Sequence, residues 1–360
     1  MKDLKELVNV IKEARSFLLL PHVHADGDAL GSCFALKLFL EDIGKTAYVL
    51  AEEPVETKLS FLTEKAGFDV LLPGSAELPD PRKIDVAIAV DVATPERLGV
   101  RGSAYKAAGI SARIDHHDSG ADFSRYTLLD PEWAAAAEGV YMLMRELGFD
   151  PDERTASGPT AACRKSAAAL YTALVTDTGC FGYSNVTADT LFIASRLRAL
   201  AGDMSYVYHL VYEVQPRAYI RLMKQVLAKM QLTEDGIAWV ALSREDFQTA
   251  EADDSDAEGI SNFLRAVEGV HVGVFIKPDK YPGRYRVSLR SDDLVNVSKI
   301  AAKYSGGGHV CAAGCMLSGK TDAEFQRELG ELLSDLSDEL TWAQYREEAS
   351  AELSDGKVGQ

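Results

Sequence analysis

The chain has 360 residues, of which 47% are hydrophobic and 26% charged, a balance that excludes a disordered or a collagen-like protein. Its length predicts two domains, since one domain usually holds about 100–200 residues. The formal net charge of −17 repels long nucleic acids and anionic membranes. A short nucleotide remains compatible with this charge if it binds in a locally basic cleft.

Strands and helices alternate in the first half of the chain. Their hydrophobic periodicity predicts strands at 16–20, 46–50, 85–90 and 110–114. It predicts helices between and after them at 4–13, 30–40, 58–65, 104–108, 132–147 and 160–174. Such alternation is typical of an α/β fold, in which a mostly parallel sheet carries helices on both faces.

The second half begins with a helical stretch and then changes its pattern. Helices are predicted at 187–200 and across 206–230, and half-exposed strands at 237–242, 271–276 and 284–289. Further helices are predicted at 258–267, 296–303 and 323–340, and a disordered tail from Ser350. We therefore expect an N-terminal α/β domain at 1–195, a helical connector at 196–230, a smaller C-terminal α/β domain at 231–342 and a tail at 343–360.

Neither export nor a membrane is indicated. No apolar run approaches the ~20 residues of a membrane-spanning helix, and the first ten residues, MKDLKELVNV, lack the apolar stretch of a signal peptide. The five cysteines are odd in number and scattered, which argues against a disulfide framework. Cys311 and Cys315 would need two more soft ligands to hold zinc, so packed thiols are favoured. We expect a reducing, cytoplasmic location.

Histidines and aspartates gather after the predicted strands. They form four motifs, which are His22-Val-His24-Ala-Asp26-Gly-Asp28, Asp91, Asp115-His116-His117 and Asp177 within Thr-Asp-Thr-Gly. The first three directly follow predicted strands, and ligands of an open parallel sheet bind outside the carboxyl ends of its strands. A single aspartate there is more often a turn or cap residue, and Asp28 by itself could be an N-cap. The repetition at four places favours a common site.

These residues are typical metal ligands. Imidazole together with several carboxylates suits Mn, Fe or Zn better than Ca or Mg alone. Two histidines and four aspartates exceed the three protein ligands of one catalytic zinc. The sequence therefore predicts a centre of two metal ions ~3.5–4 Å apart.

The second domain offers cations and glycines. Alternation along 284–290 places Arg284, Arg286, Ser288 and Arg290 on one face, and Lys277 and Lys280 precede them. This face is a candidate floor for a nucleotide, with a solvated outer face as the alternative. Gly306, Gly307 and Gly308 offer bare backbone N–H groups to a phosphate beside His309.

Together the motifs resemble those of the DHH phosphoesterase family. The order and spacing of His22, Asp26, Asp28, Asp91, Asp115-His116-His117 and Asp177 match its N-terminal domain over roughly residues 15–190. The run from Gly306 to Gly314 resembles the glycine-rich motif of the DHH-associated domain, and Ser288-Leu-Arg290-Ser291 its substrate-binding strand. The nearest group is the nano-RNase and 3′-phosphoadenosine-5′-phosphate phosphatase type. His24 departs from the pattern, since the family more often has asparagine there.

The resemblance implies roles for individual residues. It assigns two Mn²⁺ ions to His22, Asp26, Asp28, Asp91, His116 and Asp177. It implies catalytic roles for Asp91, Asp115 and His117, with Asp115 orienting His116 and His117 meeting the substrate phosphate. It assigns substrate binding to Ser288, Arg290, Ser291, Gly306, Gly307, Gly308 and His309. Gly31 would let the backbone approach this site closely.

The resemblance also implies an activity. It is hydrolysis of phosphoester bonds in very short RNA or DNA oligonucleotides, including dinucleotides, and in adenosine 3′,5′-bisphosphate, by attack of a hydroxide held between two metals. Alternatives are a cyclic-dinucleotide phosphodiesterase, a family II inorganic pyrophosphatase and a non-enzymatic nucleotide sensor. The glycine-rich motif disfavours the pyrophosphatase, and the complete ligand set disfavours the sensor. The sequence leaves open the preferred substrate, the cleavage polarity and whether the protein is a monomer or a homodimer.

Overall fold

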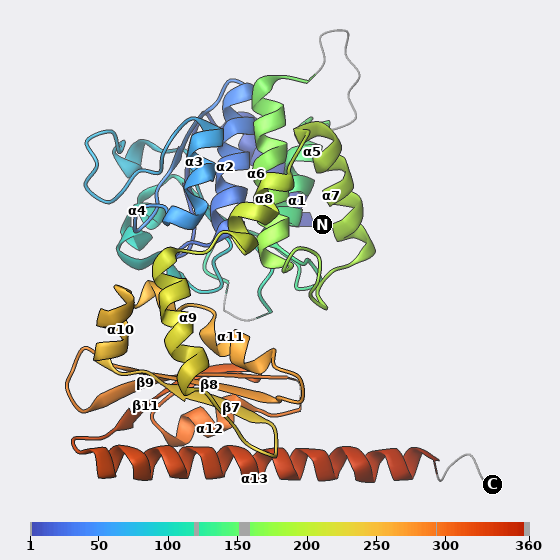
Figure 1. The fold of residues 1–360 in the computed structure, drawn as a ribbon. Helices are drawn as coiled ribbons and strands as arrows, with labels where there is room; N and C mark the ends of the chain where they lie inside the picture. The colour runs from blue at the N-terminus through green and yellow to red at the C-terminus, as the bar shows by residue number, and fades with distance from the viewer. Residues whose placement is uncertain (1, 119–121, 151–158, 293, 356–360) are drawn as a thin grey trace. The chain divides into compact units, whose positions relative to one another are not determined.

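The computed structural model describes residues 2–118, 122–150, 159–292 and 294–355. They form two compact units, one that ends at Val214 and one that begins at Gln215 (Figure 1). All five cysteines are free thiols. None of the helices in the described ranges is both long and apolar enough to cross a membrane.

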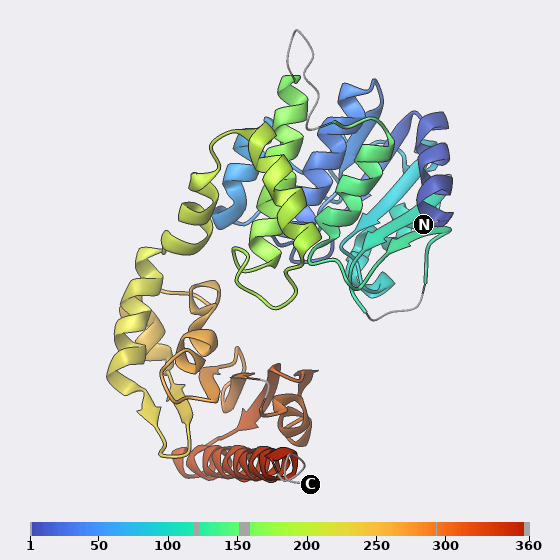
Figure 2. The ribbon, with the colours of Figure 1, turned by 90° about the vertical axis from the view of Figure 1, so that its right-hand side faces the viewer.

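The first unit is built on a five-stranded parallel sheet with the strand order β2-β1-β3-β4-β5. Its strands, side by side in Figure 2, are β1 Ser16–Leu20, β2 Thr46–Val49, β3 Val86–Val90, β4 Ile110–Asp115 and β5 Tyr126–Leu129. Because every neighbouring pair is parallel, the carboxyl ends of the strands meet at one edge.

Helices cover both faces of this sheet. They are α1 Lys2–Glu13, α2 Gly27–Asp42, α3 Ser60–Ala66, α4 Gly102–Ala107, α5 Ala136–Glu146, α6 Ala161–Asp177, α7 Ala188–Ala201 and α8 Ser205–Tyr208. Phe17 and Leu19 of β1 pack with α1, α2, α5 and α6, whereas Leu18 and Leu20 pack on the other face with Tyr105 of α4. Alternate residues of a strand point to opposite faces. The predicted α/β fold is thus confirmed.

The second unit holds a six-stranded mixed sheet with the order β10-β11-β9-β8-β7-β6. The strands are β6 Gln231–Leu232, β7 Ile237–Ala241, β8 Val272–Pro278, β9 Arg284–Ser291, β10 Gly307–His309 and β11 Ala312–Ser318. Figure 1 shows α9 Arg217–Lys229, α10 Arg244–Ala250 and α11 Ile260–Arg265 on one face, and α12 Val297–Lys303 and α13 Asp322–Asp355 on the other. Each face has its own hydrophobic core.

The structure differs from the predicted elements in several places, and it adds β5, β6 and α10, for which no strand or helix was predicted. The predicted helix at 206–230 divides into α8, a π-helical turn at His209–Glu213 and α9, because Pro216 cannot continue a helix. β10 and β11 escaped prediction because their glycine-rich sequence lacks strand periodicity. Ser350 lies inside α13, which continues to Asp355. The prediction of a disordered tail is therefore wrong for residues 350–355. Residues 356–360 lie outside the described residues.

Gly31 serves the packing of α2 on α6. A Cβ atom at Gly31 would lie 2.6 Å from the carbonyl oxygen of Ala169 and 3.1 Å from Cβ of Ala173. The structure thus gives this glycine a packing role, and its predicted role in backbone approach to the metal site stays a prediction. The two helix backbones approach so closely that no side chain fits between them.

We predict that Gly31→Ala lowers the free energy of unfolding by about 1–3 kcal/mol, because the added methyl group overpacks the α2–α6 contact. Gly330→Ala is the matched control, since a Cβ atom on this α13 glycine meets nothing within 4 Å. Alanine is the better helix former there, so the control should be neutral or stabilising by up to about 1 kcal/mol. Urea unfolding followed by circular dichroism measures both, and equal effects would contradict the packing role.

Candidate metal centre

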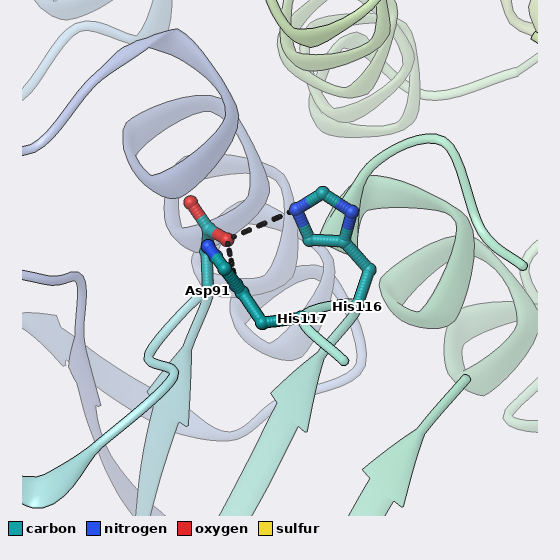
Figure 3. Close-up of side chains that lie close together, drawn as sticks. All are labelled: Asp91, His116 and His117. Carbon is teal, nitrogen blue, oxygen red and sulfur yellow. Dashed lines mark ion pairs between the residues drawn. The ribbon is translucent and has the colours of Figure 1, made fainter. Parts of the chain in front are cut away.

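The ends of three strands and two helices bring the predicted ligands together. β1 ends two residues before His22, Asp91 directly follows β3, and His116 directly follows β4. Asp28 lies in the first turn of α2, and Asp177 is the last residue of α6. The close-up in Figure 3 shows the carboxylate of Asp91 facing His116 and His117.

Asp91 occupies the middle of the cluster. Its side chain is buried, with Oδ2 3.4 Å from Nε2 of His22 and Oδ1 3.4 Å from Nε2 of His116. The backbone adopts a φ of +60°, which is uncommon outside glycine, and its N–H donates to the carbonyl of Ile114 on β4 at 2.9 Å. The neighbouring strand thus holds the turn that points this carboxylate at both histidines.

Both histidines turn Nε2 toward the carboxylates. Nδ1 of His22 lies 2.8 Å from the carbonyl of Val23, and Nδ1 of His116 lies 3.2 Å from that of Trp133. Since a carbonyl oxygen only accepts, Nδ1 of His116 carries the hydrogen, whereas Nδ1 of His22 also meets the donor Nη2 of Arg97 at 3.0 Å. His116 thus has the arrangement of a metal-binding imidazole, with the other nitrogen free for the ion.

The two aspartates at the start of α2 have different tasks. Asp26 is the N-cap, because its Oδ1 accepts the N–H groups of Asp28 and Ala29, each at 3.0 Å. Its Oδ2 lies 3.4 Å from Nε2 of His22. The cap role considered for Asp28 from the sequence therefore belongs to Asp26.

Asp28 caps a different helix. Its carboxylate, fully buried, accepts the N–H groups of Ala136 at 2.6 Å and Ala137 at 3.1 Å, at the start of α5. The N-cap residue of α5, Ala135, has no side-chain acceptor of its own. Ser32 adds a third hydrogen bond at 3.0 Å. A candidate metal ligand thus also satisfies the helix N-terminus that packs beside it.

Asp115 pairs with His117 rather than with His116. Its Oδ1 accepts from Nδ1 of His117 at 2.8 Å, and its Oδ2 accepts from the guanidinium of the buried Arg113. The expectation that Asp115 orients His116 is wrong, because Nδ1 of His116 lies 3.2 Å from the carbonyl of Trp133 instead. Both histidines follow the end of β4 and face Asp91.

The donor atoms can hold metal ions. Among the residues that the structure describes, ligand atoms within 4.8 Å of one another form three groups, which are His22, Asp26 and Asp91; Asp28, His116 and Asp177; and Asp91, His116 and His117. Asp91 Oδ1 is buried and has no hydrogen-bond partner among the described residues. An unsatisfied buried carboxylate oxygen is costly. A divalent ion would supply the missing partner, so these residues fit a metal.

The crowded charges shift the ionisation of the cluster. Although burial lowers the pKa of His22 and of His116, the nearby carboxylates, Asp91 foremost for His116 and Asp26 for His22, raise each to about 10. Burial and the neighbouring Asp91 raise the pKa of Asp28, and burial raises that of Asp177 to about 6. The metal-free site therefore holds protons on both imidazoles. A divalent ion would replace them, so metal binding releases protons.

Register in the second sheet brings three predicted substrate residues onto one face. His309 of β10 is opposite Ala312 of β11, which is opposite Arg290 of β9. Ser288 lies two residues from Arg290 and is opposite Gly314. Directly opposite residues of antiparallel strands point to the same face. Small side chains therefore separate Arg290 and Ser288 from His309.

The other predicted substrate residues take structural positions. Ser291 is buried and donates to the carbonyl of Val295 at 2.6 Å. The N–H of Gly306 donates to the carbonyl of Ala301 at 2.9 Å, so it is not free for a phosphate. A Cβ atom at Gly308 would lie 2.4 Å from the carbonyl oxygen of Ala312, whereas Gly307 has open space around it.

Most of the predicted cationic face is neutralised. Lys277 and Arg286 both pair with Asp254, at 3.2 and 3.3 Å, and Arg284 lies 4.0 Å from Asp279. The guanidinium of Arg290 donates to the carbonyl of Leu289 at 3.0 Å and forms no ion pair with any described carboxylate. Arg290 is therefore the arginine of β9 best able to meet an anion.

Sequence reasoning missed two arginines of the first unit. The spacing Arg113-x-Asp115-x-His117 on one strand was an available signal for the first. No sequence signal marked Arg97, because it follows Asp91 in a segment without periodicity. Its Nη2 lies 3.0 Å from Nδ1 of His22. Trp133 contributes only a backbone carbonyl, which no sequence pattern marks.

Known proteins resemble the chain over most of its length. Residues 16–174 match the family model of the DHH family, N-terminal domain, and residues 238–341 match that of the DHHA1 domain. The bifunctional oligoribonuclease and PAP phosphatase NrnA of Thermus thermophilus is 34% identical over 90% of each chain. The cyclic-di-AMP phosphodiesterase PdeA of Listeria monocytogenes is 24% identical over 90% of this chain and 48% of its own. The crystal structure of an exopolyphosphatase-related protein from Bacteroides fragilis has a TM-score of 0.82 at 26% identity, covering 94% of this chain and 98% of that one.

We predict that Mn²⁺ raises the melting temperature of EDTA-treated protein and that Asp91→Asn removes most of this rise. The ion binds only the folded state, and about 100 Kd of metal stabilises by about 2.7 kcal/mol, or roughly 5–10 °C. The variant should fold, because it loses one of several repelling carboxylates. Asp80→Asn, at a half-buried carboxylate paired with the exposed Arg82 outside the cluster, is the control and should keep the full rise. A full rise in Asp91→Asn would contradict the centre.

Proposed function

The chain belongs to the DHH family and is a hydrolase that acts on phosphoester bonds. We propose that its substrates are very short oligonucleotides and adenosine 3′,5′-bisphosphate. The observation that carries the proposal is the buried Asp91 carboxylate between His22 and His116, in a chain 34% identical to an oligoribonuclease and PAP phosphatase. The cyclic-di-AMP phosphodiesterase is less similar and twice as long, which favours linear substrates. Free, scattered cysteines support a cytoplasmic location.

We propose that the centre takes two Mn²⁺ ions. The group of His22, Asp26 and Asp91 would hold one, and the group of Asp28, His116 and Asp177 would hold the other with Asp91 shared. Mixed imidazole and carboxylate donors suit manganese. The four aspartates balance the charge of two divalent ions. When bound, the ions lower the pKa of water and stabilise negative charge on phosphate oxygens.

His117 is proposed to act on the substrate. Its Nδ1–H is held by Asp115, so Nε2 is the nitrogen left to meet a phosphate oxygen or the leaving group. The hydrogen bond to Asp115 raises the pKa of His117, which favours the charged, proton-donating ring. Arg113 holds Asp115 from the other side. His117 would thereby donate a proton to the leaving oxygen without serving as a metal ligand.

The second unit is proposed to bind the nucleotide. Arg290 supplies a cation without a carboxylate partner, and Ser288 and His309 supply further polar groups on the same face. Ala312 and Gly314 lie between them, and such small residues leave room for a flat base on the sheet. The net charge of −17 disfavours longer polyanions, since only local cations attract the substrate.

The substrate proposal is tested with linear dinucleotides, adenosine 3′,5′-bisphosphate, cyclic dinucleotides, pyrophosphate and oligonucleotides of increasing length, all with Mn²⁺. We predict that kcat/KM falls steeply from two to about five nucleotides and is negligible on 20-mers. Arg290→Ala should weaken the dinucleotide about 10-fold or more, as a charge-assisted contact is lost. Arg286→Ala, on the same face but paired with Asp254, is the control. Equal rates on a dinucleotide and a 20-mer would refute the proposal.

We further predict that His117→Ala lowers kcat about 10²–10⁴-fold, the usual contribution of a proton-transferring group, and leaves the Mn²⁺ content unchanged. Metal analysis of the purified variant and steady-state kinetics decide. His209→Ala, at an exposed histidine paired with Glu213, is the control and should change neither quantity. Loss of one Mn²⁺ per chain in His117→Ala would instead identify His117 as a ligand.

A further inference from the structure

Arg97 places a guanidinium beside the metal centre. It lies in the 3-10 segment Pro95–Arg101, which follows β3 and Asp91. Its backbone carbonyl accepts the N–H of Val23 at 2.8 Å, so the segment is tied to the loop that carries His22. Its Nη2 lies 3.0 Å from Nδ1 of His22. One imidazole ring thus separates this cation from the clustered carboxylates.

Nδ1 of His22 is a polar neighbour of the Arg97 guanidinium, and it also lies 2.8 Å from the carbonyl of Val23. The imidazole tautomer decides whether this nitrogen donates to the carbonyl or accepts from Arg97. A guanidinium has five N–H donors, so one imidazole nitrogen cannot satisfy them all. Arg97 forms no ion pair with a carboxylate in the part of the chain that the structure describes. Its side chain is exposed and keeps N–H groups that can meet an anion.

The other arginines close to these strand ends are already engaged. Nε of Arg101 donates to Glu52 at 3.0 Å, and its Nη1 donates to the carbonyls of Pro21 and Leu50, each at 2.8 Å. Arg113 is buried against Asp115. Neither can turn to a ligand without breaking buried hydrogen bonds. Arg97 is exposed and has no such bonds to break.

We propose that Arg97 binds the phosphoryl oxygens of the substrate at the metal-loaded centre. The inference rests on the proposed function for its ligand, a phosphate ester. Two divalent ions neutralise the four aspartates and leave the charge of the phosphate itself uncompensated. The planar fork of arginine matches two phosphate oxygens, and lysine does not. The backbone bond to Val23 keeps Arg97 at the edge of the site while its side chain is free to turn.

The test measures binding of inorganic phosphate to the Mn²⁺-loaded protein by isothermal titration calorimetry, with metal content determined on the same samples. Arg97→Ala should weaken phosphate binding about 10–100-fold, the effect of one charge-assisted contact, with unchanged Mn²⁺ content. Arg97→Lys should restore part of the affinity. Arg82→Ala is the matched control, because this exposed arginine pairs with Asp80 before β3 begins, at the opposite edge of the sheet. It should bind phosphate like the wild type.

Two results would overturn the assignment. One is wild-type phosphate affinity in Mn²⁺-loaded Arg97→Ala. The other is loss of Mn²⁺ in that variant with normal phosphate affinity in the remaining loaded protein, which would make Arg97 a support for His22. Failure of the proposed function is distinguishable, because it appears as absence of dinucleotide hydrolysis by the wild type. Weakened phosphate binding in Arg97→Ala would still support the contact in that case.

Discussion

The buried carboxylate of Asp91 is the group on which the first unit depends. One oxygen faces His22 and the other, Oδ1, faces His116, and Oδ1 has no hydrogen-bond partner among the described residues. Its backbone is held in a left-handed conformation by the carbonyl of Ile114. Such strain persists only where the surrounding structure enforces it, and here the two central strands do so. A divalent ion that satisfied Asp91 would also relieve the repulsion among its acidic neighbours.

Function and folding share the same residues around this group. Asp28 is a candidate ligand, yet it also caps α5 through the N–H groups of Ala136 and Ala137. Asp26 caps α2 with one oxygen and offers the other to the cluster. The positive ends of two helices thereby offset part of the negative charge gathered at the sheet edge. This arrangement lets a cluster of carboxylates exist in a folded chain before any cation arrives.

In the second unit, a few polar side chains lie on one face of an open sheet. Asp254 neutralises Lys277 and Arg286 and leaves Arg290 as the cation of β9 without a carboxylate partner among the described residues. Glycines at 306 and 308 allow β10 to approach β11 more closely than any side chain would permit. The second sheet thus presents Arg290, Ser288 and His309 on one face rather than a broad basic surface.

The sequence by itself determined the α/β fold of the first unit, the strands β1, β3 and β4, and the residues that gather at their carboxyl ends. These follow from hydrophobic periodicity and from motif spacing, which are local properties of the chain. Only the tertiary structure decided that Asp115 serves His117, that Asp28 caps α5 and that Arg97 faces His22. Asp28 and Ala136 are more than a hundred residues apart, and Arg97 and His22 are 75 apart. Such contacts depend on how distant segments meet in three dimensions, and no local pattern records them.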